Sequence, residues 1–137
     1  MIVLDASALV ALLVGEPAVT DAIAAIGEAD GRWVVPEHTV IEVTSALRGL
    51  ALGRQIERDE LSDLVQELID LDLDVWPTAP LLPRVVELVD NASAYDAAYL
   101  ALAEELSTTL VTLDQRLSTV PGIRCAVRIP DGSTSRP

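Results

Sequence analysis

The sequence opens with Met1-Ile2-Val3-Leu4-Asp5-Ala6-Ser7, in which a short apolar run ends at an aspartate and a second apolar stretch follows. Residues 1–4 predict a β-strand. Residues 6–14 predict a helix that stops at Gly15-Glu16-Pro17, because glycine and proline end helices. The chain therefore begins with a strand, an acid at the carboxyl end of the strand, and a helix.

Strands and helices continue to alternate along the chain. We predict further strands at 33–35, 73–76, 109–113 and 125–129, and helices at 18–29, 37–52, 57–71, 82–89 and 94–106. This alternation favours an α/β fold with a parallel sheet that helices cover on both faces. We expect one domain over residues 1–130 and a loose carboxyl-terminal tail over 131–137.

Composition limits the class of protein. Half of the 137 residues are hydrophobic and the mean hydropathy is +0.38, so the chain is expected to fold. No apolar run approaches the roughly 18 residues that span a bilayer, and no basic segment precedes the first apolar stretch, so we expect a cytoplasmic protein. The single cysteine, Cys125, allows no internal disulfide and no thiolate cluster for zinc.

The charge balance is strongly acidic. Twenty-two acidic residues face nine basic ones, which gives a net charge of −13, and all nine basic residues are arginines. This balance argues against broad, charge-driven binding of nucleic acid, which depends on many contacts to phosphate. The absence of lysine from the sequence excludes a Walker-type phosphate loop and a lysine Schiff base, and the lone His38 excludes a histidine-pair zinc site.

Four acidic residues interrupt apolar runs at positions that an α/β fold brings together: Asp5, Glu42, Asp96 and Asp114. Asp5 and Asp114 follow strands, where ligands of such folds collect. Asp96 is expected in the first turn of a buried helix and Glu42 in the second turn of another. Because an unpaired buried carboxylate costs about several kcal/mol, the four acids predict a compensating cation, Mg²⁺ or Mn²⁺.

Helix capping is the alternative interpretation for three of these acids. Asp5 and Asp114 each precede a predicted helix, where aspartate is a favoured cap. Ser93 and Asp96 have the spacing of a capping box. Glu42 does not fit this interpretation, because its helix is predicted to start at residue 37, and its own alternative is an exposed helical position.

Two hydroxyl residues accompany the acids. Ser7 follows Asp5 by two residues, and Thr112 precedes Asp114 by two. Either hydroxyl would be placed to hydrogen-bond a carboxylate or a metal-bound water. Ordinary helix-start and strand roles are the alternative, which the sequence favours for Thr112.

Two arginines are the basic residues nearest to the acids in sequence. Arg48 lies six residues after Glu42, and Arg116 lies two after Asp114. They are candidate contacts for a phosphate group, and a solvated helix surface is the equal alternative for both. His38 is interpreted as a surface or capping residue without a catalytic role.

Four segments together resemble a known family: Ile2 to Leu9, the helix that contains Glu42, Ala94-Tyr95-Asp96-Ala97-Ala98-Tyr99-Leu100-Ala101-Leu102-Ala103, and Leu110 to Leu117. In this order they resemble a PIN domain of the VapC type, the toxin of bacterial toxin–antitoxin pairs. The resemblance covers nearly the whole chain. It implies a three-layer α/β/α sandwich, Mg²⁺-dependent endoribonuclease activity, a homodimer, and inhibition by a VapB-like antitoxin whose carboxyl-terminal segment covers the active site.

The resemblance also implies roles for residues. Asp5, Glu42, Asp96 and Asp114 match the acidic quartet of the family, and Ser7 and Thr112 match its supporting hydroxyls. We expect the first three acids to form the core of the metal site and Asp114 to complete it. The lack of lysine departs from the family pattern, because contacts to RNA must then fall on few arginines.

Two other classes of function fit parts of the pattern. A Mg²⁺-dependent phosphatase or phosphotransfer domain also places acids at strand ends, but those proteins use a lysine near the phosphate. A catalytically silent interaction module would use the acids only as helix caps. Binding of Mg²⁺ distinguishes this module from the enzymes.

Overall fold

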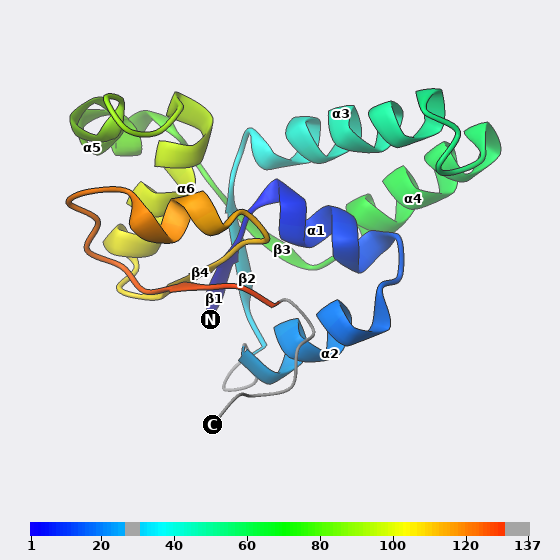
Figure 1. Ribbon diagram of the computed structural model, residues 1–137, viewed down its shortest axis with the longest axis horizontal. Helices are drawn as coiled ribbons and strands as arrows, with labels where there is room; N and C mark the ends of the chain where they lie inside the picture. Colours follow the sequence, from blue (N-terminus) through cyan, green and yellow to red (C-terminus); the bar gives the residue numbers. More distant parts are fainter. Residues whose placement is uncertain (27–30, 131–137) are drawn as a thin grey trace.

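A computed structural model of the chain describes residues 1–26 and 31–130. The described residues form a five-stranded parallel sheet with helices on both faces (Figure 1). The strands are β1 (Ile2–Leu4), β2 (Trp33–Pro36), β3 (Leu73–Trp76), β4 (Thr109–Val111) and β5 (Val127–Arg128). The helices are α1 (Ala6–Leu13), α2 (Pro17–Ile26), α3 (Thr39–Leu52), α4 (Arg58–Asp70), α5 (Leu82–Leu88) and α6 (Ala94–Glu105), with two short 3₁₀ helices, η1 (Ala79–Leu81) and η2 (Gln115–Thr119).

The sheet has the strand order β3-β2-β1-β4-β5, so β1 lies at its centre. From β1 the chain first builds outward through β2 and β3, then returns to add β4 and β5 on the other side. Ile2 pairs with Trp33 on one side and with Thr109 on the other. The strand order therefore reverses between β1 and β4, which is where open α/β sheets bind their ligands.

Alternate residues of β1 face two separate hydrophobic layers. Ile2 and Leu4 pack with α1 to α4, whereas Val3 packs with α5 and α6. Figure 1 shows the two groups of helices on opposite sides of the sheet. The three strand residues are almost completely buried, as expected for a central strand covered on both faces. The predicted α/β/α sandwich is confirmed.

Helix α6 contains the longest continuous run of buried residues among the described helices. The side chain of Ser93 caps it by accepting a hydrogen bond from the backbone N–H of Asp96 at 3.1 Å. All residues from 97 to 103 are buried, four of them alanines. These small side chains let the helix lie close against β1, β2 and β4, which holds Asp96 in the first turn near the strand ends.

Several predicted boundaries shift in the structure. Helix α3 begins at Thr39 and not at residue 37, because the Glu37 carboxylate accepts hydrogen bonds from the N–H and hydroxyl of Thr78, both at 2.9 Å. Glu42 therefore lies in the first turn of α3, not in the second as predicted. Strand β4 ends at Val111, two residues before its predicted end.

The remaining predicted elements are present with small changes in length. The fifth strand is confirmed over two residues, Val127 and Arg128. The predicted end of the helix over 18–29 and the predicted tail over 131–137 lie outside the described residues. Within the described ranges, no helix combines the length and apolar character needed to cross a membrane.

Candidate active site

The four predicted acids converge at the carboxyl ends of the central strands. Asp5 directly follows β1 and caps α1, while Asp114 follows β4 and caps η2. Glu42 comes from the first turn of α3 and Asp96 from the first turn of α6. Burial is the largest cause of the raised pKa of Asp5, Glu42 and Asp96. In addition, the negative charge of Asp96 raises the pKa of Asp5 and Glu42, and that of Asp114 raises the pKa of Asp96. The topology thus brings together acids that lie up to 109 residues apart.

Asp5 is the most buried of the four, with only 5% of its surface exposed. One carboxylate oxygen accepts hydrogen bonds from the Ser7 hydroxyl at 2.6 Å and the Ala8 N–H at 3.0 Å. The other accepts one from the Thr112 hydroxyl. Burial nevertheless raises the pKa of Asp5 above its ordinary value, because these hydrogen bonds compensate only part of the lost hydration.

The hydroxyls of Ser7 and Thr112 connect β1 and β4 at the site. Ser7 Oγ accepts a hydrogen bond from the Leu113 N–H at 2.9 Å, and Thr112 Oγ1 accepts one from the Asp114 N–H at 3.0 Å. Each hydroxyl then donates to Asp5. The interpretation of Thr112 as an ordinary strand residue is wrong, because its buried hydroxyl fixes the orientation of the Asp5 carboxylate.

Glu42 is half-buried between two aromatic residues. The phenol oxygen of Tyr99 lies 3.4 Å from Oε1 and donates to it, and Nε2 of His38 lies 3.7 Å from Oε2. Burial raises the pKa of Glu42, and the charges of Asp96 and Asp5 raise it further. The alternative of an exposed helical position is therefore not supported.

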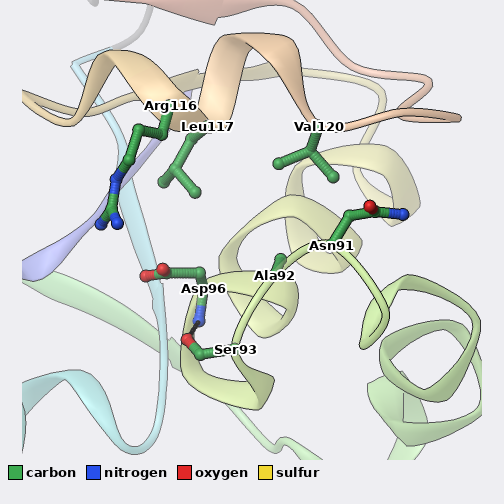
Figure 2. A pocket seen from close by; sticks show the side chains of 7 residues that line it. All are labelled: Asn91, Ala92, Ser93, Asp96, Arg116, Leu117 and Val120. Carbon is green, nitrogen blue, oxygen red and sulfur yellow. Dashed lines mark hydrogen bonds between the residues drawn. The ribbon is translucent and has the colours of Figure 1, made fainter.

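Asp96 lies at one edge of a hollow of about 490 Å³. Figure 2 shows its carboxylate and the Arg116 guanidinium pointing toward each other, with Asn91 and Ser93 also on the wall. Burial raises the pKa of Asp96, while the positive charge of Arg116 acts in the opposite direction. Asp96 and Arg116 give the hollow a polar side, and Leu117 and Val120 contribute apolar surface to its wall.

Asp114 differs from the other three acids because it has a close positive partner. Arg116 Nη2 lies 2.6 Å from Asp114 Oδ2, and the Arg116 N–H donates to Oδ1 at 3.0 Å. These contacts hold the pKa of Asp114 below its ordinary value. Asp114 is therefore both a helix cap and half of an ion pair, and the Arg116 side chain remains 85% exposed.

Arg48 lies in the surroundings of its alternative interpretation, a solvated helix surface, whereas His38 does not lie where it was expected. Arg48 is exposed on α3, about a third of a revolution around the helix from Glu42. His38 is neither a surface residue nor a side-chain cap: it precedes α3 without a capping hydrogen bond, and only 19% of its side chain is exposed. Its ring lies edge-on between Tyr95 and Tyr99, with centroid distances of 5.7 and 4.9 Å.

Tyr95 and Tyr99 are site residues that the sequence reasoning did not single out. They stand four positions apart in α6, so both face the start of α3. That spacing was visible in the sequence. Both rings contact His38, which directly precedes α3, and the sequence does not show this contact.

The acids offer oxygen ligands only, which suit a hard cation such as Mg²⁺. Among residues 1–26 and 31–130, no three acidic, histidine or cysteine side chains lie close enough to hold a metal ion by themselves. Asp5, Glu42 and Asp96 are nevertheless buried or half-buried acids with raised pKa values and negative neighbours, so added positive charge would stabilise all three. The donor set fits Mg²⁺, which usually takes one or two carboxylates directly and retains several waters.

Comparison with known proteins identifies the family. Residues 2–123 match the sequence model of the PIN domain. The chain belongs to the PIN-domain family. Ribonuclease VapC9 of Mycobacterium tuberculosis, a curated relative of this PIN domain, is 36% identical over 129 residues, which cover 94% of this chain and 98% of VapC9.

Solved structures show the same PIN fold. The structure of FitAB bound to the IR36 DNA fragment superposes with a TM-score of 0.72 and 18% identity, and covers 99% of both chains. A toxin–antitoxin complex from Klebsiella pneumoniae gives a TM-score of 0.63 with 19% identity, covering 95% of this chain and 98% of that one. At these identities the likeness supports the fold assignment.

Proposed function

We propose that this PIN domain is a Mg²⁺-dependent endoribonuclease and the toxin of a toxin–antitoxin pair. The observation that carries the proposal is the meeting of Asp5, Glu42 and Asp96 at the switch point of the sheet, where burial and negative neighbours raise all three pKa values. Buried carboxylates that lie near one another cost folding free energy, so a purely structural use of them would bring the protein little benefit. The ribonuclease names of the VapC relatives support RNA as the substrate.

The surroundings of the residues support the role proposed for each. Asp5, Glu42 and Asp96 would hold Mg²⁺, and Asp114 would complete the site from its ion pair with Arg116. Bound Mg²⁺ lowers the pKa of an attacking water and compensates charge on the leaving oxygen of a phosphodiester. Ser7 and Thr112 hold the Asp5 carboxylate in one orientation. Arg116, exposed and facing Asp96 across the hollow, is the better placed of the two candidate phosphate contacts.

The acidic charge of the protein suits an RNA-cutting toxin that must be controlled. A net charge of −13 repels RNA in general and restrains unselective cleavage. The same charge attracts an antitoxin with a basic carboxyl-terminal segment, which would cover the acids. We further propose a homodimer and a cytoplasmic location, where RNA and antitoxin are both available.

The test is RNA cleavage by Glu42→Gln and Asp96→Asn proteins. Both variants keep the size of the side chain and remove one carboxylate. Asp63→Asn, on the exposed face of α4, is the matched control that removes the same charge elsewhere. We expect cleavage that requires Mg²⁺ in the parent and control proteins and is lost in the two site variants. Undiminished Mg²⁺-dependent cleavage by both site variants would exclude the proposal.

Two structural observations favour a second candidate, the silent interaction module. Asp5 and Asp114 do cap helices, and no tight three-ligand cluster exists in the described part of the chain. Isothermal titration with Mg²⁺ distinguishes the two, because capping acids bind no stoichiometric metal. The phosphatase alternative still lacks the lysine that its chemistry uses.

A further inference from the structure

A second hollow adjoins the acids on the side of Glu42. It measures about 340 Å³ and is lined by His38, Ile41, Glu42, Ser45 and Tyr95. Glu42 belongs both to this hollow and to the group of acids, and Tyr95 directly precedes Asp96 in α6. A ligand held here would therefore lie next to the carboxylates of the proposed cleavage site.

The wall of this hollow exposes apolar surface to an unusual degree. Ile41 is 72% exposed and Tyr95 is 63% exposed. The whole chain has two tyrosines, two tryptophans and no phenylalanine. An aromatic ring is thus rare in this protein, and this one is left open to solvent beside the site.

The exposed ring has a firm support behind it. His38 contacts Tyr95 edge-on at 62° and contacts Tyr99 in the same manner at 61°. Tyr99 is completely buried in the core. The Tyr95 ring therefore packs on His38, which packs on the buried Tyr99. This packing restricts the motion of the Tyr95 ring, so less conformational entropy is lost when a flat ligand stacks on it.

The charge of the chain narrows the identity of that ligand. With nine arginines against 22 acids, phosphate contacts supply little of the affinity for RNA. A nucleobase is uncharged and flat and stacks on aromatic side chains, and its amino groups can donate hydrogen bonds to the oxygens of Glu42 and Ser45. In paired RNA these faces and edges are not available.

We propose that Tyr95, supported by His38 and flanked by Ile41, is a stacking site for one unpaired base of the RNA, next to the nucleotide that is cut. The inference rests on the proposed ribonuclease function and deepens it, because it assigns part of the affinity for RNA to one base and to Tyr95. Tyr95 acts here as a binding and positioning residue.

Binding is measured separately from cleavage, so that the two proposals fail in different ways. The probe is a short, fluorescein-labelled, single-stranded RNA of random sequence, titrated by anisotropy with Mg²⁺ present. The protein carries Asp96→Asn, which is expected to prevent cutting. On this background Tyr95→Ala is expected to weaken binding about 5- to 100-fold. Tyr95→Phe keeps the ring and is the matched control, with affinity close to that of the parent.

A second readout uses cleavage by proteins with an intact Asp96. Tyr95→Ala is expected to raise KM by a similar factor and to change kcat little, because stacking holds the substrate but does not touch the reacting atoms. RNA with one base removed at successive positions should show one position where base removal weakens binding to the parent and has no further effect on Tyr95→Ala.

The outcomes separate the hypotheses. Unchanged RNA affinity in Tyr95→Ala overturns the stacking site, and so does equal weakening by Tyr95→Ala and Tyr95→Phe. If Tyr95→Ala keeps its affinity for RNA but loses that for a protein partner, the hollow is a protein contact and the inference is wrong. A parent protein that cuts no RNA refutes the proposed function, whereas the anisotropy titration still decides the stacking site.

Discussion

The hydroxyl of Thr112, just past the end of β4, donates a hydrogen bond to the carboxylate of Asp5, at the end of β1. The two strands are neighbours at the point where the strand order reverses, with Leu4 paired to Val111. A residue 107 positions away thus holds the most buried acid of the site. This contact makes the geometry of the proposed metal site depend on the register of the central strands.

Thr112→Val tests this contact. Valine has the same shape but no hydroxyl, so it removes the bond to Asp5 and leaves the Asp114 N–H without its acceptor. We expect a loss of about 1–3 kcal/mol in the free energy of unfolding, measured with urea, and a strong loss of cleavage. Thr112→Ser keeps the hydroxyl and should retain more of the cleavage activity. A fully active and stable valine variant would contradict the positioning role.

Removal of one repelling acid should stabilise the metal-free protein. Burial and negative neighbours raise the pKa of Glu42 and Asp96, so the charged form of each carboxylate is destabilised in the folded protein. Glu42→Gln and Asp96→Asn are each expected to gain about 1 kcal/mol in EDTA, a typical gain when an active-site strain is removed. Asp114→Asn is the contrast, since Arg116 lowers its pKa and its loss should destabilise. Thermal unfolding of the three variants measures these signs.

Added Mg²⁺ should stabilise the parent protein by mass action. A metal that binds only the folded state raises stability by about 2.7 kcal/mol at a concentration of 100 times its Kd. We expect a concentration-dependent rise in Tm for the parent, and none for a protein carrying both Glu42→Gln and Asp96→Asn. Ca²⁺ at equal ionic strength is the control for general charge screening. It carries the same charge as Mg²⁺ but is larger and prefers more ligands, so a site suited to Mg²⁺ should bind it less well. An equal rise in the double variant would place the metal elsewhere.

Arg116 and Arg48 are predicted to differ in their effect on RNA. Arg116 faces Asp96 at the hollow, whereas Arg48 is turned away from Glu42 on α3. Arg116→Gln should weaken RNA binding and lower the slope of log K against log salt by about 0.7, the value of one contact to single-stranded phosphate. Arg48→Gln should leave the slope unchanged. Anisotropy titrations at several salt concentrations measure both slopes. A lower slope for Arg48→Gln and an unchanged slope for Arg116→Gln would assign the phosphate contact to Arg48.

The ion pair between Arg84 and Glu104, outside the site, is expected to make the stability of the fold depend on pH in the acidic range. Arg84 donates two hydrogen bonds to Glu104, at 2.7 and 3.2 Å, and Glu104 also accepts the Arg124 N–H at 2.7 Å. Burial would raise the pKa of Glu104, but these bonds prevail and hold it below its ordinary value. Its stabilisation is therefore present above the pKa of the unfolded chain, about 4.3, and is lost as pH falls through the lower folded value.

Glu104→Gln makes that dependence measurable. At neutral pH the variant should be about 1.5–3 kcal/mol less stable than the parent, since hydrogen bonds to a charged group are weakened. The difference should shrink as the pH falls below about 4, because Glu104 of the parent then becomes protonated. Urea unfolding across this range tests the sign. A difference that is independent of pH would show that the carboxylate charge does not contribute.

Much of the fold was predictable because its signals are local. The apolar run before Asp5 predicts the strand, and the alternation that follows predicts a parallel sheet covered on both faces. The buried helix after Ser93 was predicted from its alanine-rich composition and its cap. The start of α3 was not, because Glu37 is held by Thr78, a contact that no local pattern contains.

The sequence by itself determined the family, the order of the elements and the chain positions of the four acids. Only the tertiary structure decided the contacts of the site residues. Asp5 is held by Thr112, Asp114 is paired with Arg116, and His38 packs between two tyrosines. The physical reason is the distance along the sequence over which each kind of interaction acts. Propensity and hydrophobic period act over a few residues, whereas the partner of a buried polar group depends on which strand ends the sheet places side by side.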